Sequence, residues 1–161
     1  MTIAIRELRP SDYQPVISVI DSWWGGRHMA DMLPRLFFEH FTGTSFAAED
    51  DGDLAAFLVG LVSQSRPGEA YIHFVGVRPA DRDRGLGRQL YERFFTVVRA
   101  RGCDLVRSVT SPVNTGSIRF HTRMGFEVAP GDKEVDGIQV TAGYDGDGQD
   151  RVRFIKRLDR Y

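Results

Sequence analysis

Cysteine is nearly absent from this chain of 161 residues, since Cys103 is the only one. A single thiol cannot close a disulfide within the chain, and a zinc site built from several cysteines is excluded. The chain also lacks an uncharged apolar run as long as a membrane span, and Arg6, Glu7 and Arg9 interrupt any signal-peptide core near the start. These absences predict a cytoplasmic protein without a membrane partner.

An excess of charge of one sign is missing as well. The 21 Lys and Arg residues nearly balance the 22 Asp and Glu residues, which leaves a formal net charge of −1. No global basic field therefore attracts nucleic acid, and we expect no nucleic-acid partner. The hydrophobic fraction of 42% is typical of a globular protein, and the length is close to one average domain of about 150 residues. We expect a single domain over residues 1–161.

Hydrophobic spacing predicts the elements of the first half of the chain. The turn Asp51-Gly52 accepts the positive φ angles of a tight hairpin. In chain order we expect a strand over residues 2–8, a helix from Ser11 or Asp12 to just before Gly25-Gly26, a short helix over residues 31–41, a hairpin with strands over residues 44–50 and 54–64, and a central strand over residues 70–77.

The second half begins with a strongly amphipathic helix from Gly85 to Arg101, and Gly102 supplies its left-handed cap. After it we expect a strand over residues 105–109, a helix over residues 114–124, and strands over residues 126–128 and 152–158. The order β-α-α-β-β-β-α-β-α-β-β predicts an α/β (α+β) fold.

The segment between residues 129 and 150 is too rich in Gly and Asp to hold a core element, so we expect a long loop or a mobile hairpin. Its run from Asp145 resembles the start of a calcium loop. That loop requires glycine at position six and glutamate at position twelve, where this chain has Asp150 and Lys156. We therefore expect no metal.

Residues 77–88 carry the clearest chemical signal, because a strand leads through a loop into a helix. Gly85 and Gly87 leave room for a ligand beside the backbone, and the first N–H groups of the helix have no intrahelical partners. The helix dipole adds positive potential, and Arg82, Arg84 and Arg88 add full charges. This arrangement predicts a phosphate or pyrophosphate site.

Two acidic residues in the same loop, Asp81 and Asp83, oppose anion binding, so we expect both to point outward. Two common phosphate motifs do not fit. A Walker loop has no counterpart here, and a dinucleotide fingerprint fails because Leu90 replaces the third glycine and seven residues separate Val77 from Gly85.

The remaining string, Arg82-x-x-Gly85-x-Gly87, resembles the acyl-CoA pyrophosphate motif of the GNAT superfamily of N-acetyltransferases. The pattern Val77-x-Pro79 before it agrees. The segment Asn114 to Phe126 is similar to the second conserved block of that superfamily. The resemblance covers nearly the whole chain, and it implies a mixed, mostly antiparallel central sheet of about seven strands flanked by helices.

The same resemblance implies direct transfer of an acetyl group from acetyl-CoA to a primary amine, without a metal or a covalent enzyme intermediate. Main-chain groups of Val75 and Val77 would bond the pantetheine arm, and Asn114 would meet that arm from the other side, where the two central parallel strands splay apart. The residues implied to hold the pyrophosphate are Arg82, Arg84, Gly85, Leu86, Gly87 and Arg88.

Two histidines are candidate catalytic residues. His121 occupies the position where many family members have tyrosine, and it either donates a proton to the leaving thiolate, positions a water or fills space. Strand alternation places His73 on the face of Val75 and Val77, so it is a candidate base; the alternatives are a structural histidine, or Glu39 or Glu69 acting through water. The Val75 N–H is a candidate donor to the thioester oxygen.

Trp23, Trp24 and Arg27 lie between the first two expected helices, which border the acceptor pocket in this family. They form either an exposed recognition surface, with Arg27 receiving a carboxylate, or core packing beside a glycine turn. The acceptor stays open among a small amine, an amino acid, an antibiotic and a peptide amine. A homodimer through the C-terminal strands is a family-level expectation, and a non-catalytic acyl-CoA sensor is the alternative function.

Overall fold

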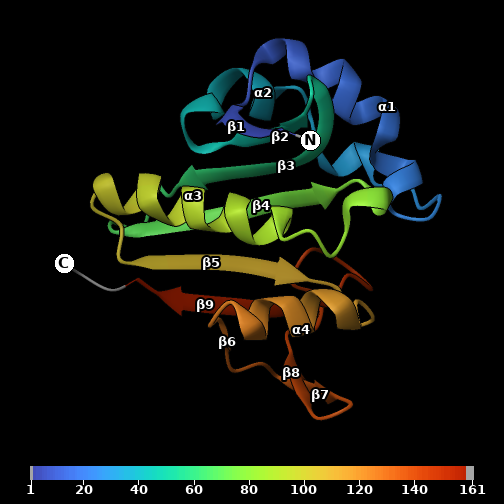
Figure 1. Ribbon diagram of the computed structural model, residues 1–161. Helices are drawn as coiled ribbons and strands as arrows, with labels where there is room; N and C mark the ends of the chain where they lie inside the picture. The colour runs from blue at the N-terminus through green and yellow to red at the C-terminus, as the bar shows by residue number, and fades with distance from the viewer. Residues whose placement is uncertain (1, 159–161) are drawn as a thin grey trace. The chain divides into compact units, whose positions relative to one another are not determined.

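The computed structural model describes residues 2–158 (Figure 1). Its strands form a seven-stranded sheet in the order β1-β2-β3-β4-β5-β9-β6 and a separate two-stranded sheet, β7-β8. The β4–β5 pair is parallel, whereas β1–β2, β2–β3, β5–β9 and β6–β9 are antiparallel. The expected mixed, mostly antiparallel sheet is confirmed. Two compact units make up the chain: unit 1 is Met1–Val62 and Ile72–Arg101, and unit 2 is Ser63–Tyr71 and Gly102–Tyr161.

Unit 1 follows the expected order of elements. The turn between β2 and β3 has the two positive φ angles that the sequence predicted, 50° at Asp51 and 91° at Gly52. The elements are β1 (Ile3–Glu7), α1 (Tyr13–Trp23), α2 (Leu36–His40), β2 (Phe46–Asp50), β3 (Asp53–Val62), most of β4 (Glu69–Val77) and α3 (Leu86–Ala100), with 3₁₀ turns at Pro10–Asp12, Ala30–Met32, Thr42–Thr44 and Pro79–Asp81.

The continuous helix expected over residues 31–41 is wrong. The chain forms a 3₁₀ turn at Ala30–Met32, breaks at Leu33, and begins α2 only at Leu36. The cause is Pro34, whose ring disfavours helical geometry in the preceding residue, and Leu33 accordingly has φ −131° and ψ 70°.

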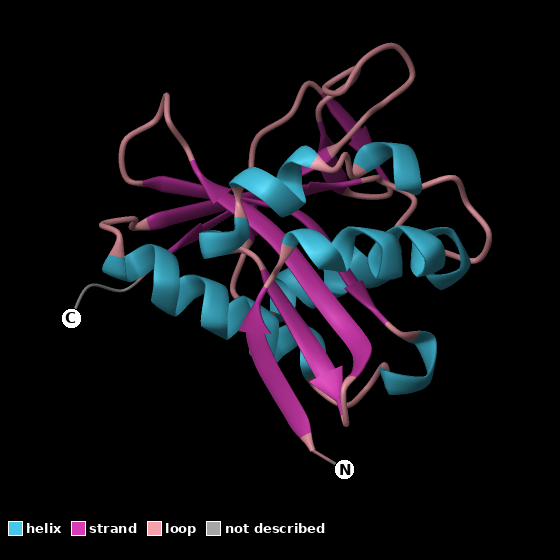
Figure 2. Cartoon of the chain, turned by 90° about the horizontal axis from the view of Figure 1, so that it is seen from above, coloured by secondary structure: helices cyan, strands magenta, loops and turns pink. Residues whose placement is uncertain are grey.

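Unit 1 buries strand side chains on both faces of the sheet. Five consecutive β3 residues, Ala55 to Val59, are completely buried, as a strand covered on both sides requires. α1 contributes Val16, Ile20 and Trp23 to the core, and α3 packs on β2 and β3. β1, the strand beside the N label in Figure 2, is the edge strand of the sheet and pairs with β2.

Unit 2 is built on β9, which pairs with β5 along six residues and with β6 along two. The segment for which we expected a loop or a hairpin contains a short hairpin with Asp136 and Gly137 at its turn, both with positive φ. Its elements are β5 (Leu105–Thr110), α4 (Thr115–Arg123), β6 (Glu127–Val128), β7 (Lys133–Val135), β8 (Ile138–Val140) and β9 (Val152–Arg157).

The acidic run of unit 2 that resembles a calcium loop has cationic partners. Asp150 lies 3.0 Å from the Lys133 amine and also accepts the Gly143 N–H at 2.9 Å. Asp145 lies 2.7 Å from the Arg151 guanidinium. These contacts hold the loop that connects β8 to β9.

Candidate functional site

β4 pairs with β5 in parallel over its first three residues. The pairs are Glu69 with Leu105, Ala70 with Val106 and Tyr71 with Arg107, all within unit 2. β4 itself continues from Ile72 to Val77 within unit 1. Main-chain groups at the end of this strand are therefore candidates for bonding a ligand.

β4 also contains one extra residue relative to β3. The Ser63 N–H bonds the Glu69 carbonyl at 2.9 Å, and the Arg78 N–H bonds the Ala55 carbonyl at 2.8 Å. Between these two bonds β3 advances eight positions and β4 nine, which defines a β-bulge in β4. Since Arg78 is directed at β3, strand alternation directs the main-chain groups of Val77 to the opposite edge.

The loop after β4 turns the chain sharply into α3. It begins with the 3₁₀ turn at Pro79–Asp81, and Asp83 and Gly85 both have left-handed backbones, with φ of 73° and 75°. Gly85 is the N-cap of α3, so the N–H groups of the first helical turn point into the space beside the loop without intrahelical acceptors. Such a turn is a candidate anion-binding site.

Asp81 does not point outward, so that prediction is wrong. Its side chain accepts hydrogen bonds from Arg78 Nε and Arg84 Nη1, and the residue is only 5% exposed. Asp50 lies behind it, with Oδ2 at 3.4 Å from Arg84 Nη1 and 3.8 Å from Arg78 Nη2. The carboxylate turns inward because two guanidinium groups compensate its charge there, and Arg78, followed by Arg84, holds the pKa of Asp81 below its usual value. Asp83 is exposed, as expected.

The guanidinium groups of Arg82 and Arg84 form hydrogen bonds within unit 1 that hold the loop in place. Arg82 Nη2 donates to the Trp23 carbonyl at 2.6 Å, and Arg82 Nε donates to the Val77 carbonyl at 3.4 Å. Arg84 bonds carboxylates, while Arg88 is largely exposed and lies 4.0 Å from Glu92, one turn along α3. Main-chain N–H groups are therefore candidate anion donors of this loop. Asp50 and Arg78 were not predicted as site residues, although the spacing of Arg78, Asp81 and Arg84 at three-residue steps was a visible signal.

His73 is fixed by two contacts within unit 1. Its Nε2 lies 2.6 Å from the Met32 carbonyl, and its ring stacks on Phe37 with centroids 4.4 Å apart and an interplanar angle of 10°. A carbonyl only accepts, so Nε2 carries a proton and Nδ1 is the nitrogen that can take one up. Of the two alternative bases, Glu39 is exposed on α2, whereas Arg107 bonds Glu69 at 3.0 Å and lowers its pKa.

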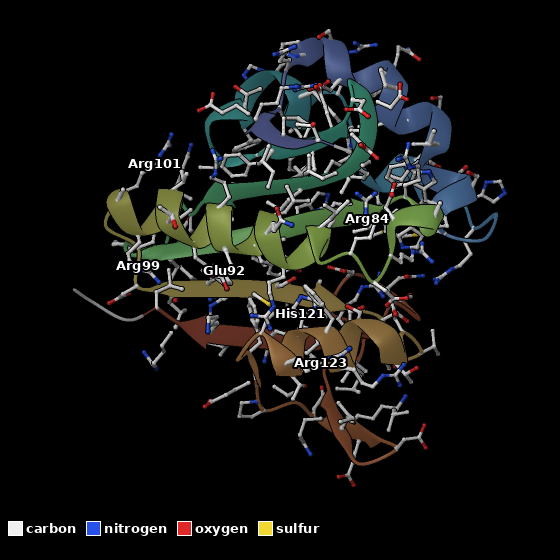
Figure 3. The ribbon with its side chains drawn as sticks, viewed as in Figure 1. Arg84, Glu92, Arg99, Arg101, His121 and Arg123 are labelled. Atoms are coloured by element: carbon white, nitrogen blue, oxygen red, sulfur yellow. The ribbon has the colours of Figure 1, made fainter. Side chains whose placement is uncertain are left out.

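The second sequence block folds as α4 in unit 2. The Asn114 side chain caps this helix by accepting the Ser117 N–H at 3.1 Å. Figure 3 shows His121 on α4. The residue is 5% exposed, its Nδ1 lies 2.8 Å from the Ser117 carbonyl, and its ring stacks on that of Phe154 with centroids 4.3 Å apart. Burial lowers the pKa of His121, so the imidazole is neutral at pH 7 with its proton on Nδ1. The contact with the pantetheine arm predicted for Asn114 and the catalytic role predicted for His121 stay predictions.

The His121→Phe variant is expected to flatten the dependence of stability on pH. The unfolded histidine, with a pKa of about 6.5, binds a proton more readily than the folded one, so the free energy of unfolding should fall on acidification below about pH 6.5 and be constant above it. Phenylalanine cannot titrate, and it can keep the stack on Phe154. Urea unfolding from pH 5 to 8 measures how the free energy of unfolding changes with pH in the wild type and in the variant. The control variant is His28→Phe, because the His28 side chain is 97% exposed. If the free energy of unfolding depended equally on pH in the wild type, His121→Phe and His28→Phe, the lowered pKa of His121 would be contradicted.

The tryptophan pair is not an exposed surface. Trp23 is 6% exposed and stacks on Phe57 at 6.0 Å within the core, so core packing is the correct interpretation for this residue. Trp24 is half-buried, with its ring 4.9 Å from that of Phe74. Arg27 is exposed on the turn that follows α1, and its predicted contact with a substrate carboxylate stays a prediction.

Residues 2–158 contain no group of three or more His, Cys, Asp or Glu side chains arranged to hold a metal ion. In the same range, none of the helices is both long enough and apolar enough to cross a membrane. Cys103 is buried.

Comparison with known families identifies the class. A family model described as the acetyltransferase (GNAT) family matches residues 4–126, a range that contains both sequence blocks and the bulged strand β4. The chain belongs to the GNAT acetyltransferase family.

Several characterised relatives are similar over part of their length. An L-2,4-diaminobutyric acid acetyltransferase of Nocardia farcinica is 31% identical over 83 residues, which are 52% of this chain and 43% of that protein. A mycothiol acetyltransferase of Beutenbergia cavernae is 38% identical over 79 residues, 48% of this chain and 26% of its own. The matched segment therefore spans less than half of either relative.

Solved structures show the same fold over the whole chain. Ard1 from Thermoplasma volcanium has a TM-score of 0.79 at 21% identity and covers 99% of this chain and 100% of its own. A second structure is the diaminobutyrate acetyltransferase EctA from Paenibacillus lautus, solved with L-2,4-diaminobutyric acid and coenzyme A. Its TM-score is 0.71 at 17% identity, and the match covers 99% of this chain and 98% of that one. These identities establish the fold and no more.

Proposed function

We propose that this protein transfers an acetyl group from acetyl-CoA to the primary amine of a small acceptor. The observation that carries the proposal is the loop of residues 78–85, which joins a bulged strand end to a glycine-capped helix start. Family membership and the CoA-bound fold relative support it. The chemistry is direct attack of the amine on the thioester.

The residues present fit an acyl-CoA. Gly85 and Gly87 place no side chain beside the first turn of α3, and its N–H groups suit a pyrophosphate. The inward turn of Asp81 removes one carboxylate from the surface that this anion would meet. Acetyl-CoA supplies the acyl group and a thiol leaving group; Val77 would bond its pantetheine arm through the main chain, and the Val75 N–H is the proposed donor to the thioester oxygen.

The acceptor amine must lose a proton before it attacks, because a lysine-like amine has a pKa of about 10.4. We assign this step to His73, since the bond to the Met32 carbonyl leaves Nδ1 as its accepting nitrogen and the Phe37 stack fixes the ring. His73 belongs to β4, the strand that also carries Val75 and Val77.

The His73→Gln variant tests this base. The glutamine amide can still donate to the Met32 carbonyl, but it cannot accept the amine proton as a base, so kcat should fall roughly 100-fold. The matched variant is Glu39→Gln, which removes the exposed alternative on α2. A fall of this size in Glu39→Gln, with His73→Gln unchanged, would move the role to Glu39 acting through water.

We propose an amino-acid-like amine as the acceptor class. The relatives that support this act, by their names, on L-2,4-diaminobutyric acid and on L-methionine sulfoximine or L-methionine sulfone. Arg27 is exposed on the turn after α1 and has the charge and geometry to receive an acceptor carboxylate. An Arg27→Ala variant should raise the acceptor KM and leave the affinity for acetyl-CoA unchanged.

Calorimetric titration with acetyl-CoA, with ATP as the control ligand, tests the function as a whole. The expected result is saturable one-to-one binding of acetyl-CoA and no response to ATP. Thiol release on addition of a panel of amino-acid amines then tests turnover. Binding without thiol release from any amine would favour a non-catalytic acyl-CoA sensor, and absence of binding by the folded protein would reject both functions.

A further inference from the structure

We propose that Asp81 is a positioning residue for the CoA pyrophosphate, which it serves by holding the preceding loop in its binding shape. This inference rests on the proposed function. Asp81 touches no reacting atom in that scheme. Its carboxylate ties together the start and the end of the loop, through Arg78 Nε and Arg84 Nη1.

Main-chain bonds repeat the same connections. The Asp81 N–H donates to the Arg78 carbonyl at 2.8 Å, and the Arg84 N–H donates to the Asp81 carbonyl at 3.3 Å. Residues 78, 81 and 84 are therefore linked by two successive turns, each closed once through the backbone and once through a side chain. The second turn ends next to Gly85, the N-cap of α3, so its geometry sets the direction of the first free N–H groups.

A second carboxylate supports this arrangement from the β2–β3 hairpin. Asp50 Oδ2 lies 3.4 Å from Arg84 Nη1, and the Asp50 side chain is 12% exposed. Two carboxylates thus face two guanidinium groups beneath the loop, and the four formal charges cancel. Arg84 is consequently held away from the position of a direct phosphate ligand, although a motif-based interpretation would place it there.

Asp81 could act on CoA binding through its negative charge or by ordering the loop, and the two roles predict opposite effects of removing its carboxylate. If Asp81 acted on a bound pyrophosphate only through its negative charge, its neutralisation would strengthen CoA binding, because two arginines would then be less compensated. If Asp81 acts by ordering the loop, neutralisation weakens binding, since the N–H groups lose their preset direction before the anion arrives. The sign of the change in affinity therefore decides between the two.

The experiment is a calorimetric titration of CoA into the wild type, Asp81→Asn and Asp83→Asn. Asp83 is the matched control, because it lies in the same loop, is exposed, and has a left-handed backbone that asparagine also adopts. We expect Asp81→Asn to weaken CoA binding about tenfold with one site per chain, and Asp83→Asn to leave it unchanged or slightly stronger. Unchanged or tighter binding by Asp81→Asn would overturn the proposal.

The number of sites separates loop positioning from a general loss of structure. An irreversibly unfolded fraction of the sample lowers the number of sites without changing Kd, and that result for Asp81→Asn would reject a positioning role. If Asp81→Asn does not fold, Asp50→Asn takes its place, with an expected weakening of about threefold, smaller because its contacts are longer; no weakening in that variant would also overturn the proposal. Failure of the wild type to bind CoA would reject the proposed function itself, whatever the variants do.

Discussion

Replacing Gly87 with glutamate is expected to abolish CoA binding, with Kd raised at least about 100-fold, which corresponds to about 2.7 kcal/mol. Gly87 lies in the first turn of α3, where its N–H group has no intrahelical acceptor. The substitution places a carboxylate where the pyrophosphate is proposed to lie, so the two anions compete for the same N–H groups and repel each other. Calorimetry with CoA measures the loss.

The same substitution should leave the fold intact, which makes the prediction specific. Glutamate has a higher helix propensity than glycine, and a negative charge in the first turn interacts favourably with the helix dipole. The thermal midpoint of Gly87→Glu should therefore equal or exceed that of the wild type. The control Gly87→Ala adds a methyl group without charge and should weaken CoA binding far less. Wild-type affinity in Gly87→Glu would remove the pyrophosphate from this loop.

Replacing Gly76 with valine is expected to destabilise the fold by about 3 kcal/mol. Gly76 is a buried residue of β4, and a Cβ there would lie 2.6 Å from Phe57 Cε1 and 2.9 Å from Trp24 Cη2. Neither aromatic ring has room to withdraw easily, because Trp24 and Phe57 both pack against Phe74. Thermal unfolding should show the midpoint lowered by about 8 °C for a chain of this length.

A second glycine provides the control for this prediction. Gly116 in α4 has open surroundings, since the nearest atom to an added Cβ is Asn114 Oδ1 at 3.9 Å. Gly116→Ala should be neutral or stabilising, by up to about 1 kcal/mol from helix propensity. Gly76→Ala should fall between Gly76→Val and the wild type. A midpoint for Gly76→Val equal to that of the wild type would show that the aromatic cluster repacks without cost.

Most elements of the fold were predictable because their signals act within one turn or one strand. The left-handed residues Asp51 and Gly52 placed the β2–β3 turn, and the apolar spacing from Leu86 to Val98 placed α3 and its buried face. The error over residues 31–41 has a local cause too, because Pro34 prevents helical geometry at Leu33. The hairpin β7–β8 was left open between a loop and a hairpin, since its strands have only three residues each.

The sequence predicted where the candidate site lies, but only some of the residues that build it. Residues 82–87 predicted an anion-binding loop, because glycine spacing and a helix start are local properties. Charge alone suggested that Asp81 faces solvent, yet it is buried between Arg78 and Arg84. Nothing local showed that Arg82 bonds the Trp23 carbonyl, which lies 59 residues away in the chain.

The sequence by itself therefore determined the order of elements, the capping glycines and the two blocks that define the family. Only the tertiary structure decided three features: the nitrogen of His73 that carries a proton, the burial of the Asp81 carboxylate, and the need for glycine at position 76 of β4. These features depend on Met32, the loop arginines and the Phe57 ring, which other segments bring to them. The physical reason is that backbone preference is set by neighbours in the chain, whereas the burial and partner of a polar group are set by whichever segments the fold places beside it.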